Sequence, residues 1–401
     1  MKPNKKCPIS WKIIEPFVEK IQDEKKYGFR ISQGIVKRHF YVKSLTELDD
    51  WLDRLSRVAI MTDIKNDFDF KSLLGTGSYS YVYLATDLEN GQEYAIKCIP
   101  KYQLQSIEHF SALINEIEIM KSLDHPRIIK IHKIYESPHH VHLVLDYAQG
   151  GDLFQRIGTN GPITEKKAII LIKNLLNVIE YLNSKNIVHR DIKLQNIFMV
   201  SKNNDTEIKL GDFGLSCINT EKLTQICGSP GFTAPEILKR DIYGSKVDVF
   251  SVGIVLFMLL TGKTPWSAKN KKELVLQNRD CKVPFAEALS SQNSREMIKL
   301  VKKLMMPNPN SRPSASQILR SRYLREAEDS IRPRRRSQSV CGSILYEKNN
   351  DQGNKDNNEE SKFVENNQKG ATDRHAKFES VLRLLYESKR WETESKNCWG
   401  L

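Results

Sequence analysis

The sequence lacks the features that mark membrane proteins and secreted proteins. No stretch among its 401 residues approaches the roughly 18 apolar residues that a membrane-spanning helix needs. Residues 1–9 are too polar to form the apolar part of a secretory signal. The seven cysteines are scattered, odd in number and contain no Cys-x-x-Cys pair, which argues against a zinc site or a disulfide framework. We therefore expect reduced thiols and a location in the cytoplasm, with the nucleus as a second compartment.

Acidic residues are the minority among the charged ones. Lys and Arg number 62 and Asp and Glu 49, which gives a formal net charge of +13. A basic balance favours anionic partners such as phosphates, lipid head groups, acidic peptides or nucleic acid, and by itself it selects none of them. Hydrophobic residues make up 39% of the chain, so we expect most of it to fold, in about two to three domains.

Three regions differ in composition. Residues 1–67 alternate apolar and polar positions before becoming amphipathic, and residues 68–324 hold most of the glycines, prolines and long apolar runs. Residues 325–401 are polar, and between residues 347 and 376 the only large apolar side chains are Phe363 and Val364. Such a segment buries too little apolar surface to offset its chain entropy, so we expect a mostly disordered tail.

The first region predicts two strands and a helix. Residues 27–32 and 36–43 alternate as strands do around a turn at Gly34. Ser44 and Glu47 fit a capping box at a helix start. The apolar positions that follow at helical spacing are Leu48, Trp51, Leu52 and Leu55. This arrangement resembles the C-terminal half of a pleckstrin-homology domain, within residues 8–61.

Two points limit what that resemblance implies. The alternative is a helical extension that docks on the next domain. Pleckstrin-homology domains usually bind phosphoinositide through basic residues of their first hairpin, and residues 1–67 leave no room for that hairpin. Phosphoinositide binding is therefore not expected from the resemblance alone.

A glycine-rich stretch opens the second region. Residues 73–82 read Leu-Leu-Gly-Thr-Gly-Ser-Tyr-Ser-Tyr-Val. Gly75 and Gly77 permit a tight turn whose backbone amides can approach a triphosphate, although an ordinary hairpin would look the same. Residues 94–97 predict a strand with a single cation, Lys97, and residues 106–123 predict a helix that carries Glu116.

The most specific signal lies further along the chain. Residues 187–196 read Ile-Val-His-Arg-Asp-Ile-Lys-Leu-Gln-Asn, and residues 209–214 read Lys-Leu-Gly-Asp-Phe-Gly. They are followed by Ala234, Pro235, Glu236, Asp248, Gly253 and Arg312. Each piece could arise by chance, but their joint order and spacing resemble the eukaryotic protein kinase family over residues 68–324. The resemblance implies a two-lobed α+β fold, with a small β-rich lobe and a large helical lobe.

The resemblance also implies ATP and Mg²⁺ as cofactors. Phosphoryl transfer depends mostly on positioning and on cations that offset charge on the phosphoryl oxygens. Lys97 is expected to hold the α- and β-phosphates and Glu116 to fix Lys97, while Asp212 and Asn196 are expected to hold Mg²⁺. The remaining residues assigned to nucleotide binding are Leu74, Gly75, Thr76, Gly77, Ser78, Tyr79, Ser80, Tyr81, Val82, Ala95, Asp146, Ala148 and Phe198.

The substrate side of the expected site is typical of serine/threonine kinases. Asp191 is expected to accept the proton of the substrate hydroxyl, and Lys193 is expected to contact the γ-phosphate. The hydroxyl of Ser229 is expected to bond to both Asp191 and Lys193. Asp152 is expected to pair with an Arg three residues before the target. Gln195 replaces the Glu of many basophilic kinases, which weakens selection for Arg two residues before the target.

Met258, at the other carboxylate position of that pocket, weakens the same selection further. Ser80 replaces the third glycine of the phosphate loop and should stiffen it without loss of activity. Glu236 and Arg312 are expected to form a buried structural ion pair.

The predicted activation segment, residues 212–236, leaves two alternatives open. Residues 227–232 read Cys-Gly-Ser-Pro-Gly-Phe and resemble calcium/calmodulin-type kinases. Gln225 occupies the usual activating phosphosite, so either Thr224 is phosphorylated instead or the segment is ordered without phosphorylation. No EF-hand spacing follows the kinase region.

Two tail segments could regulate the kinase. Residues 334–339 are a basic cluster with serines three positions after arginines, which fits an autoinhibitory phosphosite, a plain linker or a nuclear import signal. Residues 377–391 place apolar residues on one face of a predicted helix, which fits a calmodulin target, an autoinhibitory helix or a helix docked on the kinase. We expect protein substrates, no nucleic-acid partner and a monomer. A pseudokinase scaffold and a lipid-tethered adaptor are the alternative functions.

Overall fold

The computed structural model describes residues 17–331, apart from 24–25, 34–35, 57–58, 78, 105, 219–221 and 290–292. The tail segments predicted at 334–339 and 377–391 therefore lie outside the described residues, as does Ser78 of the phosphate loop.

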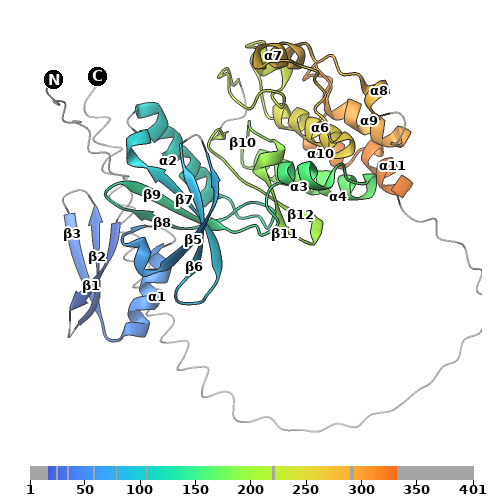
Figure 1. The fold of residues 1–401 in the computed structure, drawn as a ribbon. Helices are drawn as coiled ribbons and strands as arrows, with labels where there is room; N and C mark the ends of the chain where they lie inside the picture. Colours follow the sequence, from blue (N-terminus) through green and yellow to red (C-terminus); the bar gives the residue numbers. More distant parts are fainter. Residues whose placement is uncertain are drawn as a thin grey trace, which may run out of the picture. The chain divides into compact units, whose positions relative to one another are not determined.

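The small lobe is built on an antiparallel sheet with one long helix (Figure 1). Its strands are β5 (Phe68–Thr76), β6 (Tyr81–Asp87), β7 (Glu93–Pro100), β8 (Ile131–Glu136) and β9 (His140–Asp146), and its helix is α2 (Ile107–Ser122). They run in the order β8-β9-β7-β6-β5. The predicted strand at 94–97 and helix at 106–123 are confirmed, and Ser106 caps the helix by accepting a hydrogen bond from the amide of His109.

The N-terminal region contains the two predicted strands, the predicted helix and two strands that were missed, β1 and β4. Its elements are β1 (Phe17–Asp23), β2 (Lys26–Gln33), β3 (Val36–Val42), α1 (Leu45–Ser56) and β4 (Ile60–Met61). The Phe29 ring stacks on Phe40 with centroids 5.2 Å apart and lies 5.9 Å from Trp51 of the helix. Apolar residues on one face of the strands therefore pack against the apolar stripe of α1, as an amphipathic helix requires. The likeness to a pleckstrin-homology domain stays a prediction.

This region shares a sheet with the small lobe, which the sequence reading did not predict. Strand β4 pairs in parallel with β1 on one side and with β8 on the other, so strands β1 to β9 form one nine-stranded sheet. Ile60 lies opposite Ile134 of β8 and is fully buried. The alternative of a helical extension alone is therefore wrong, because strands make the junction.

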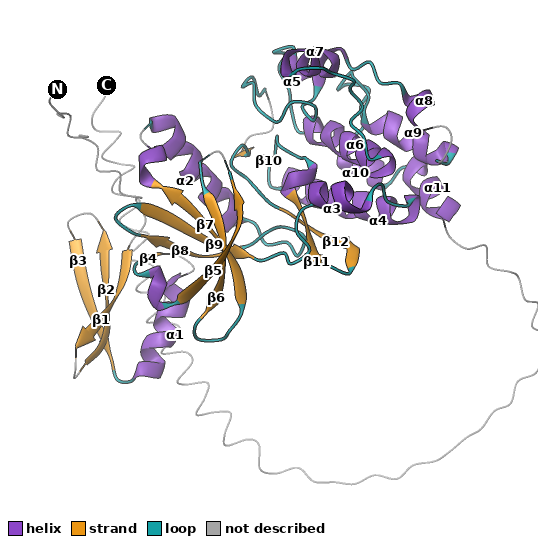
Figure 2. Cartoon of the chain, viewed as in Figure 1, coloured by secondary structure: helices purple, strands orange, loops and turns teal. Residues whose placement is uncertain are grey.

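The large lobe is mainly helical, as Figure 2 shows by colour. Its helices are α3 (Leu153–Asn160), α4 (Glu165–Ser184), α5 (Pro235–Leu238), α6 (Lys246–Thr261), α7 (Lys271–Asp280), α8 (Phe285–Leu289), α9 (Arg295–Leu304), α10 (Ala315–Leu319) and α11 (Arg322–Ile331). Its strands are β10 (Ile187–Val188), β11 (Ile197–Ser201), β12 (Asn204–Leu210) and β13 (Cys217–Ile218). Helix α6 is buried from Val247 to Leu260, so it forms the centre of this lobe. The two-lobed α+β fold is confirmed.

Helix α11 corrects the predicted end of the folded region. It runs to Ile331, whereas the polar tail was predicted to begin at residue 325. Leu324 and Ala327 are buried, and α11 contacts α9 and α4. The burial of these two apolar side chains extends the fold beyond the point where the composition turns polar.

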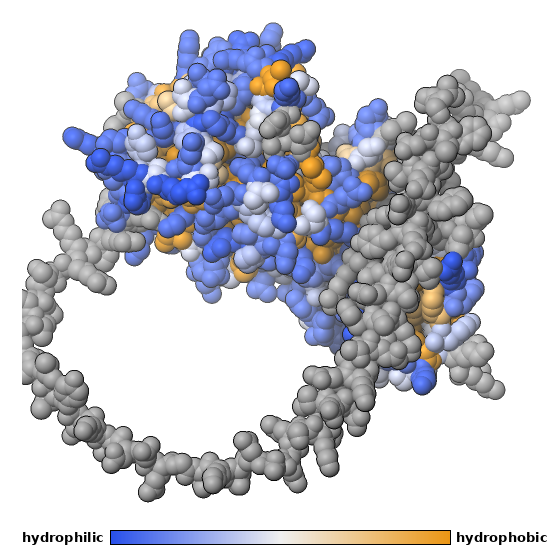
Figure 3. All heavy atoms as spheres, turned by 180° about the vertical axis from the view of Figure 1, so that it is seen from behind, coloured by the Kyte–Doolittle hydropathy of each residue, from blue (hydrophilic) through white to orange (hydrophobic). Residues whose placement is uncertain are grey.

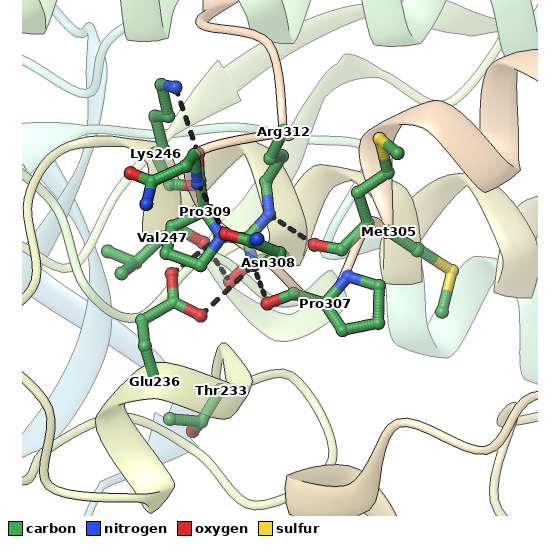
Figure 4. A network of polar contacts seen from close by, with 12 residues as sticks. Thr233, Glu236, Lys246, Val247, Met305, Pro307, Asn308, Pro309 and Arg312 are labelled. Atoms are coloured by element: carbon green, nitrogen blue, oxygen red, sulfur yellow. Dashed lines mark hydrogen bonds and ion pairs between the residues drawn. The ribbon is translucent and has the colours of Figure 1, made fainter.

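Arg312 and Glu236 form the predicted buried ion pair, shown in Figure 4. The pair is bidentate, with Nη1 to Oε1 at 2.7 Å and Nη2 to Oε2 at 3.0 Å. The guanidinium also donates to the backbone carbonyls of Met306, Pro307 and Lys246. A buried charge is tolerated when its donors are satisfied in this way, so the pair joins three segments of the large lobe.

The surface is mostly hydrophilic on the side seen in Figure 3, where hydrophobic residues form small separate patches. No helix in the described part of the chain is long and apolar enough to cross a membrane.

Candidate active site

Lys97 and Glu116 meet beneath the glycine-rich stretch. Strand β7 carries Lys97, and its Nζ lies 2.6 Å from Oε1 of Glu116 on helix α2 and 4.0 Å from Oδ1 of Asp212. Both partners of the closer pair are largely buried. Burial lowers the pKa of Lys97, but the two carboxylates outweigh it and leave that pKa above its ordinary value. Lys97 is therefore a fixed cation.

Asp212 places an ionised carboxylate close to the Lys97–Glu116 pair. Its backbone is left-handed, with φ of 60°, in the segment that follows β12. Burial raises the pKa of Asp212, but Lys97, His189 and Lys193 outweigh it and hold that pKa below its ordinary value. The side chain is 48% exposed, so its oxygens are open to a ligand.

The loop before Asp191 is held from the core of the large lobe. The backbone amides of His189 and Arg190 donate to the carboxylate of Asp248 on α6, at 2.8 and 2.9 Å. Nε2 of His189 lies 3.1 Å from the carbonyl of Gly211, and the amide of Asp191 donates to Nδ1 of the same ring at 3.3 Å. This network orients Asp191 before any substrate arrives.

Two predicted residues bond to the carboxylate of Asp191, and Ser229, which was expected to bond to both Asp191 and Lys193, bonds to Lys193 alone. Oδ2 of Asp191 accepts from Nζ of Lys193 at 2.7 Å and from Nδ2 of Asn196 at 3.2 Å. Nζ of Lys193 also donates to Oγ of Ser229, at 2.9 Å. Oδ1 of Asp191 is buried and has no hydrogen-bond partner among the described residues. One oxygen is thus fixed by the protein while the other is free to accept a proton or a hydrogen bond.

The glycine-rich stretch forms the turn between β5 and β6. The amide of Gly77 donates to the carbonyl of Ser80 at 2.8 Å, which closes the turn. Gly75 pairs with Val82 across the two strands. Tyr79 is exposed, and its ring lies 4.9 Å from that of His109 on α2. The remaining residues of the stretch that were assigned to the nucleotide and are described, Leu74, Thr76 and Tyr81, are exposed.

The residues expected around the adenine come from both lobes. Ala95 is buried on β7, and Val82 pairs with Lys97 from the neighbouring strand. Phe198 lies on β11, and a Cβ on Gly211 would lie 2.9 Å from its ring. Only glycine therefore fits beside this aromatic face. Ala148 is half-buried against the core.

Asp146 was assigned to nucleotide binding, but its side chain contacts other residues of the protein. Its carboxylate binds the ring of His132, the ammonium of Lys209 and the amide of Lys130. Burial raises the pKa of Asp146, but these three donors outweigh it and lower that pKa to about 2. The side chain is thus committed to protein contacts, and the backbone amide of Asp146 donates to the carbonyl of Lys130 at 3.0 Å.

Asp152 is the N-cap of helix α3 in the large lobe. Its Oδ1 accepts from the amide of Gln155 at 2.9 Å, as N-cap side chains do. The cap uses one carboxylate oxygen and leaves the other for a substrate. Gln195 is exposed, whereas Met258 is buried.

The activation segment is tied down through the guanidinium of Arg190. Its Nε donates to the carbonyl of Leu215 at 2.7 Å, and Nη1 lies 3.2 Å from Oε1 of Gln225 and 3.3 Å from the hydroxyl of Tyr243. That hydroxyl donates in turn to the carbonyl of Gln225 at 2.7 Å, and the backbones of Tyr243 and Leu223 exchange two hydrogen bonds. The neutral side-chain amide of Gln225, which occupies the usual activating phosphosite, thus faces the guanidinium of Arg190.

Sequence reasoning missed two residues near the site, Tyr243 and Asn115. Tyr243 lies outside the predicted activation segment, and Asn115 precedes Glu116 on α2. Nδ2 of Asn115 donates to the carbonyl of Ser216 at 2.8 Å. No motif contained either residue, and only the adjacency of Asn115 to Glu116 could have drawn attention to it.

The comparisons with known proteins agree with this geometry. Residues 68–324 match the family described as the protein kinase domain. The chain is 33% identical over 321 residues to a probable serine/threonine-protein kinase 2 of Plasmodium falciparum, covering 79% of this chain and 60% of that protein.

Two further relatives match about two thirds of the chain. It is 33% identical over 267 residues to myosin light chain kinase A of Dictyostelium discoideum, covering 66% of this chain and 90% of that protein. It is 34% identical over 264 residues to the human calcium/calmodulin-dependent protein kinase type 1B, covering 65% of this chain and 76% of that protein.

Proposed function

This chain belongs to the protein kinase family, among the serine/threonine kinases, and on that premise we propose that it phosphorylates protein substrates with Mg²⁺-bound ATP and prefers Arg three residues before the target. The observation that carries the proposal is the free, buried Oδ1 of Asp191 beside an Oδ2 that Lys193 and Asn196 hold.

The residues present fit ATP and Mg²⁺. Among the described residues no group of three or more His, Cys, Asp or Glu side chains could hold a metal alone. Mg²⁺ usually takes one or two carboxylates together with substrate phosphates, so the open carboxylate of Asp212 suits it. Nδ2 of Asn196 is used by Asp191, which leaves its Oδ1 for a second ion. Bound Mg²⁺ would neutralise charge on the phosphates.

The protein's own groups supply positioning and proton acceptance. The Lys97 cation, fixed by Glu116, would hold the α- and β-phosphates. Oδ1 of Asp191 would accept the proton of a substrate hydroxyl and orient its oxygen toward the γ-phosphorus. Lys193, now bonded to Asp191 and Ser229, would meet the γ-phosphate. Asp248 holds the catalytic loop through the backbone amide of His189.

Substrate choice follows from the acidic and neutral positions around the site. The free carboxylate oxygen of Asp152 supports a preference for Arg three residues before the target. Gln195 and Met258 carry no charge, so Arg two residues before the target gains little. Charge-assisted pairs are the stronger hydrogen bonds, which is why this one carboxylate would dominate the choice.

Of the two alternatives for activation, the contacts of Gln225 support order without phosphorylation. The guanidinium of Arg190 already has three hydrogen-bond partners, which are Leu215 and Gln225 of the activation segment and Tyr243. Thr224 is exposed beside it. Control by calmodulin or by residues 334–339 stays a prediction, because those residues lie outside the described part of the chain.

A degenerate-peptide screen with Mg²⁺ and ATP tests the proposal. We expect phosphate on Ser and Thr, strong selection for Arg three residues before the target and weak selection two residues before it. Asp152→Asn should lose that selection while phosphorylating neutral peptides at the same rate. Dominant selection for Arg at the nearer position would contradict the substrate preference. An absence of phosphotransfer would favour the pseudokinase scaffold.

A further inference from the structure

Asn115 connects helix α2 to the chain that follows Asp212. Its Nδ2 donates to the backbone carbonyl of Ser216 at 2.8 Å, across 101 positions of sequence. The neighbouring residue on the helix is Glu116, which holds Lys97. Helix α2 thus makes one contact with the lysine of the small lobe and, through the next residue, one with the backbone beyond Asp212.

Ser216 is the point at which that backbone is fixed. It is 1% exposed, and its amide donates to the carbonyl of Phe213 at 2.9 Å, which closes a turn. Its Oγ donates to the carbonyl of His189 at 3.3 Å. The next residue, Cys217, begins β13 and pairs with Val188 of β10. The hydrogen bond from Asn115 links the backbone of Ser216 to helix α2.

The carboxylate of Asp212 depends on this turn for its position. Its side chain is 48% exposed and lies 4.0 Å from Lys97, which is longer than a hydrogen bond. A Cβ on Gly214, within the turn, would lie 3.4 Å from Oδ1 of Asp212, so the backbone of the turn passes close to the carboxylate. The backbone of Asp212 is left-handed, a conformation that non-glycine residues adopt only where the surroundings hold them. A shift of Ser216 would therefore move the carboxylate.

We propose that Asn115 is a positioning residue for Asp212. Its hydrogen bond to Ser216 couples the turn over residues 212–216 to helix α2, so that Asp212 and the Lys97–Glu116 pair are held in one arrangement. This inference rests on the proposed function, because it takes Asp212 to bind Mg²⁺ together with ATP.

Two substitutions of Asn115 and one matched control test the proposal in the full chain. Asn115→Ala removes the amide. Asn115→Asp keeps the size of the side chain but offers a carboxylate that cannot donate to a carbonyl. The control is Asn174→Ala, because Nδ2 of Asn174 on α4 likewise donates to a backbone carbonyl, that of Thr206, at 3.0 Å.

The measurements are kcat, the KM for an Arg-containing peptide and the Mg²⁺ concentration that gives half-maximal rate. Loss of one hydrogen bond should lower kcat by about three- to tenfold in both Asn115 variants. The Mg²⁺ concentration required should rise by a similar factor, and the peptide KM should stay unchanged. Asn174→Ala should lower thermal stability without changing kcat or the Mg²⁺ requirement. The inference is overturned if Asn115→Ala keeps both wild-type values, or if Asn174→Ala changes them as much.

Calorimetric binding of ATP with and without Mg²⁺ separates this inference from the proposed function. A wild-type chain that binds ATP more tightly with Mg²⁺ but transfers no phosphate would contradict the proposed function only. In that case a smaller gain from Mg²⁺ in Asn115→Ala would support the positioning role, and an unchanged gain would overturn it.

Discussion

Nζ of Lys97 and Oε1 of Glu116 lie 2.6 Å apart, and this contact joins strand β7 to helix α2. Both side chains are largely buried, so solvent screens the pair weakly. The pair fixes the orientation of α2, whose Asn115 reaches the segment after Asp212. The small lobe and the carboxylates of the site are therefore connected through one helix.

Glu116→Gln should lower kcat by about ten- to a hundredfold, because it removes the carboxylate from a charge-assisted hydrogen bond to a buried ammonium. Steady-state phosphorylation of a peptide measures this. The matched control is Glu118→Gln, because Glu118 is exposed on the same helix. Equal rates for the two variants would show that the pair does not position Lys97.

Arg312→Ala should lower the free energy of unfolding by about 3–5 kcal/mol, because it leaves the buried carboxylate of Glu236 without its partner. Urea unfolding followed by circular dichroism measures the change. Arg322→Ala is the control, since its pair with Glu326 is on the surface and its removal should hardly shift the midpoint. Similar shifts for both would contradict the structural role of the buried pair.

Stability should fall as the pH drops from about 6.5 to about 4, in part because of His142. Burial, with a smaller contribution from His140, lowers the pKa of His142 to about 4. Its ring contacts Sγ of Cys98 at 3.2 Å and Oγ of Ser137 at 3.4 Å. The unfolded chain binds a proton near pH 6.5 and the folded chain only near pH 4, so acid favours unfolding across this interval.

The test of that pH dependence is urea unfolding of wild type and His142→Gln at several pH values. The wild type should lose up to about 3 kcal/mol more than the variant over the interval. Parallel curves for the two proteins would show that His142 does not titrate in this way.

Ile60→Ala should destabilise the kinase domain by about 2–5 kcal/mol, because Ile60 is fully buried where β4 joins β8. Thermal unfolding measures it. Leu45→Ala is the control, since Leu45 is 47% exposed at the start of α1. If Ile60→Ala unfolds as the control does, the N-terminal strands are not an integral part of the small lobe.

The central residues of the site could be predicted because their chemistry fixes both residue type and spacing. Asp191, Lys193 and Asn196 lie within one short loop, so their convergence needs little tertiary information. The contact of Lys97 with Glu116 depends on the fold, and only the family resemblance allowed it to be expected.

The parts that could not be predicted depend on tertiary contacts. Strand β4 has two residues, which is too short for an alternating pattern, and its parallel partners are far away in sequence. The bond from Asn115 to Ser216 joins a helix to a backbone carbonyl, which no side-chain pattern indicates. The polar tail was predicted to begin too early, at residue 325, because Ala327 is a weak apolar signal although it is buried.

The role of Asp191 is best examined by single-turnover phosphoryl transfer with purified wild type and Asp191→Asn, together with their ATP affinities. We expect Asp191→Asn to bind ATP about as well as wild type and to transfer phosphate at least about a hundredfold more slowly, because the amide cannot accept the hydroxyl proton. Phosphate transfer by Asp191→Asn at the wild-type rate would contradict the assignment of Asp191 and the mechanism built on it.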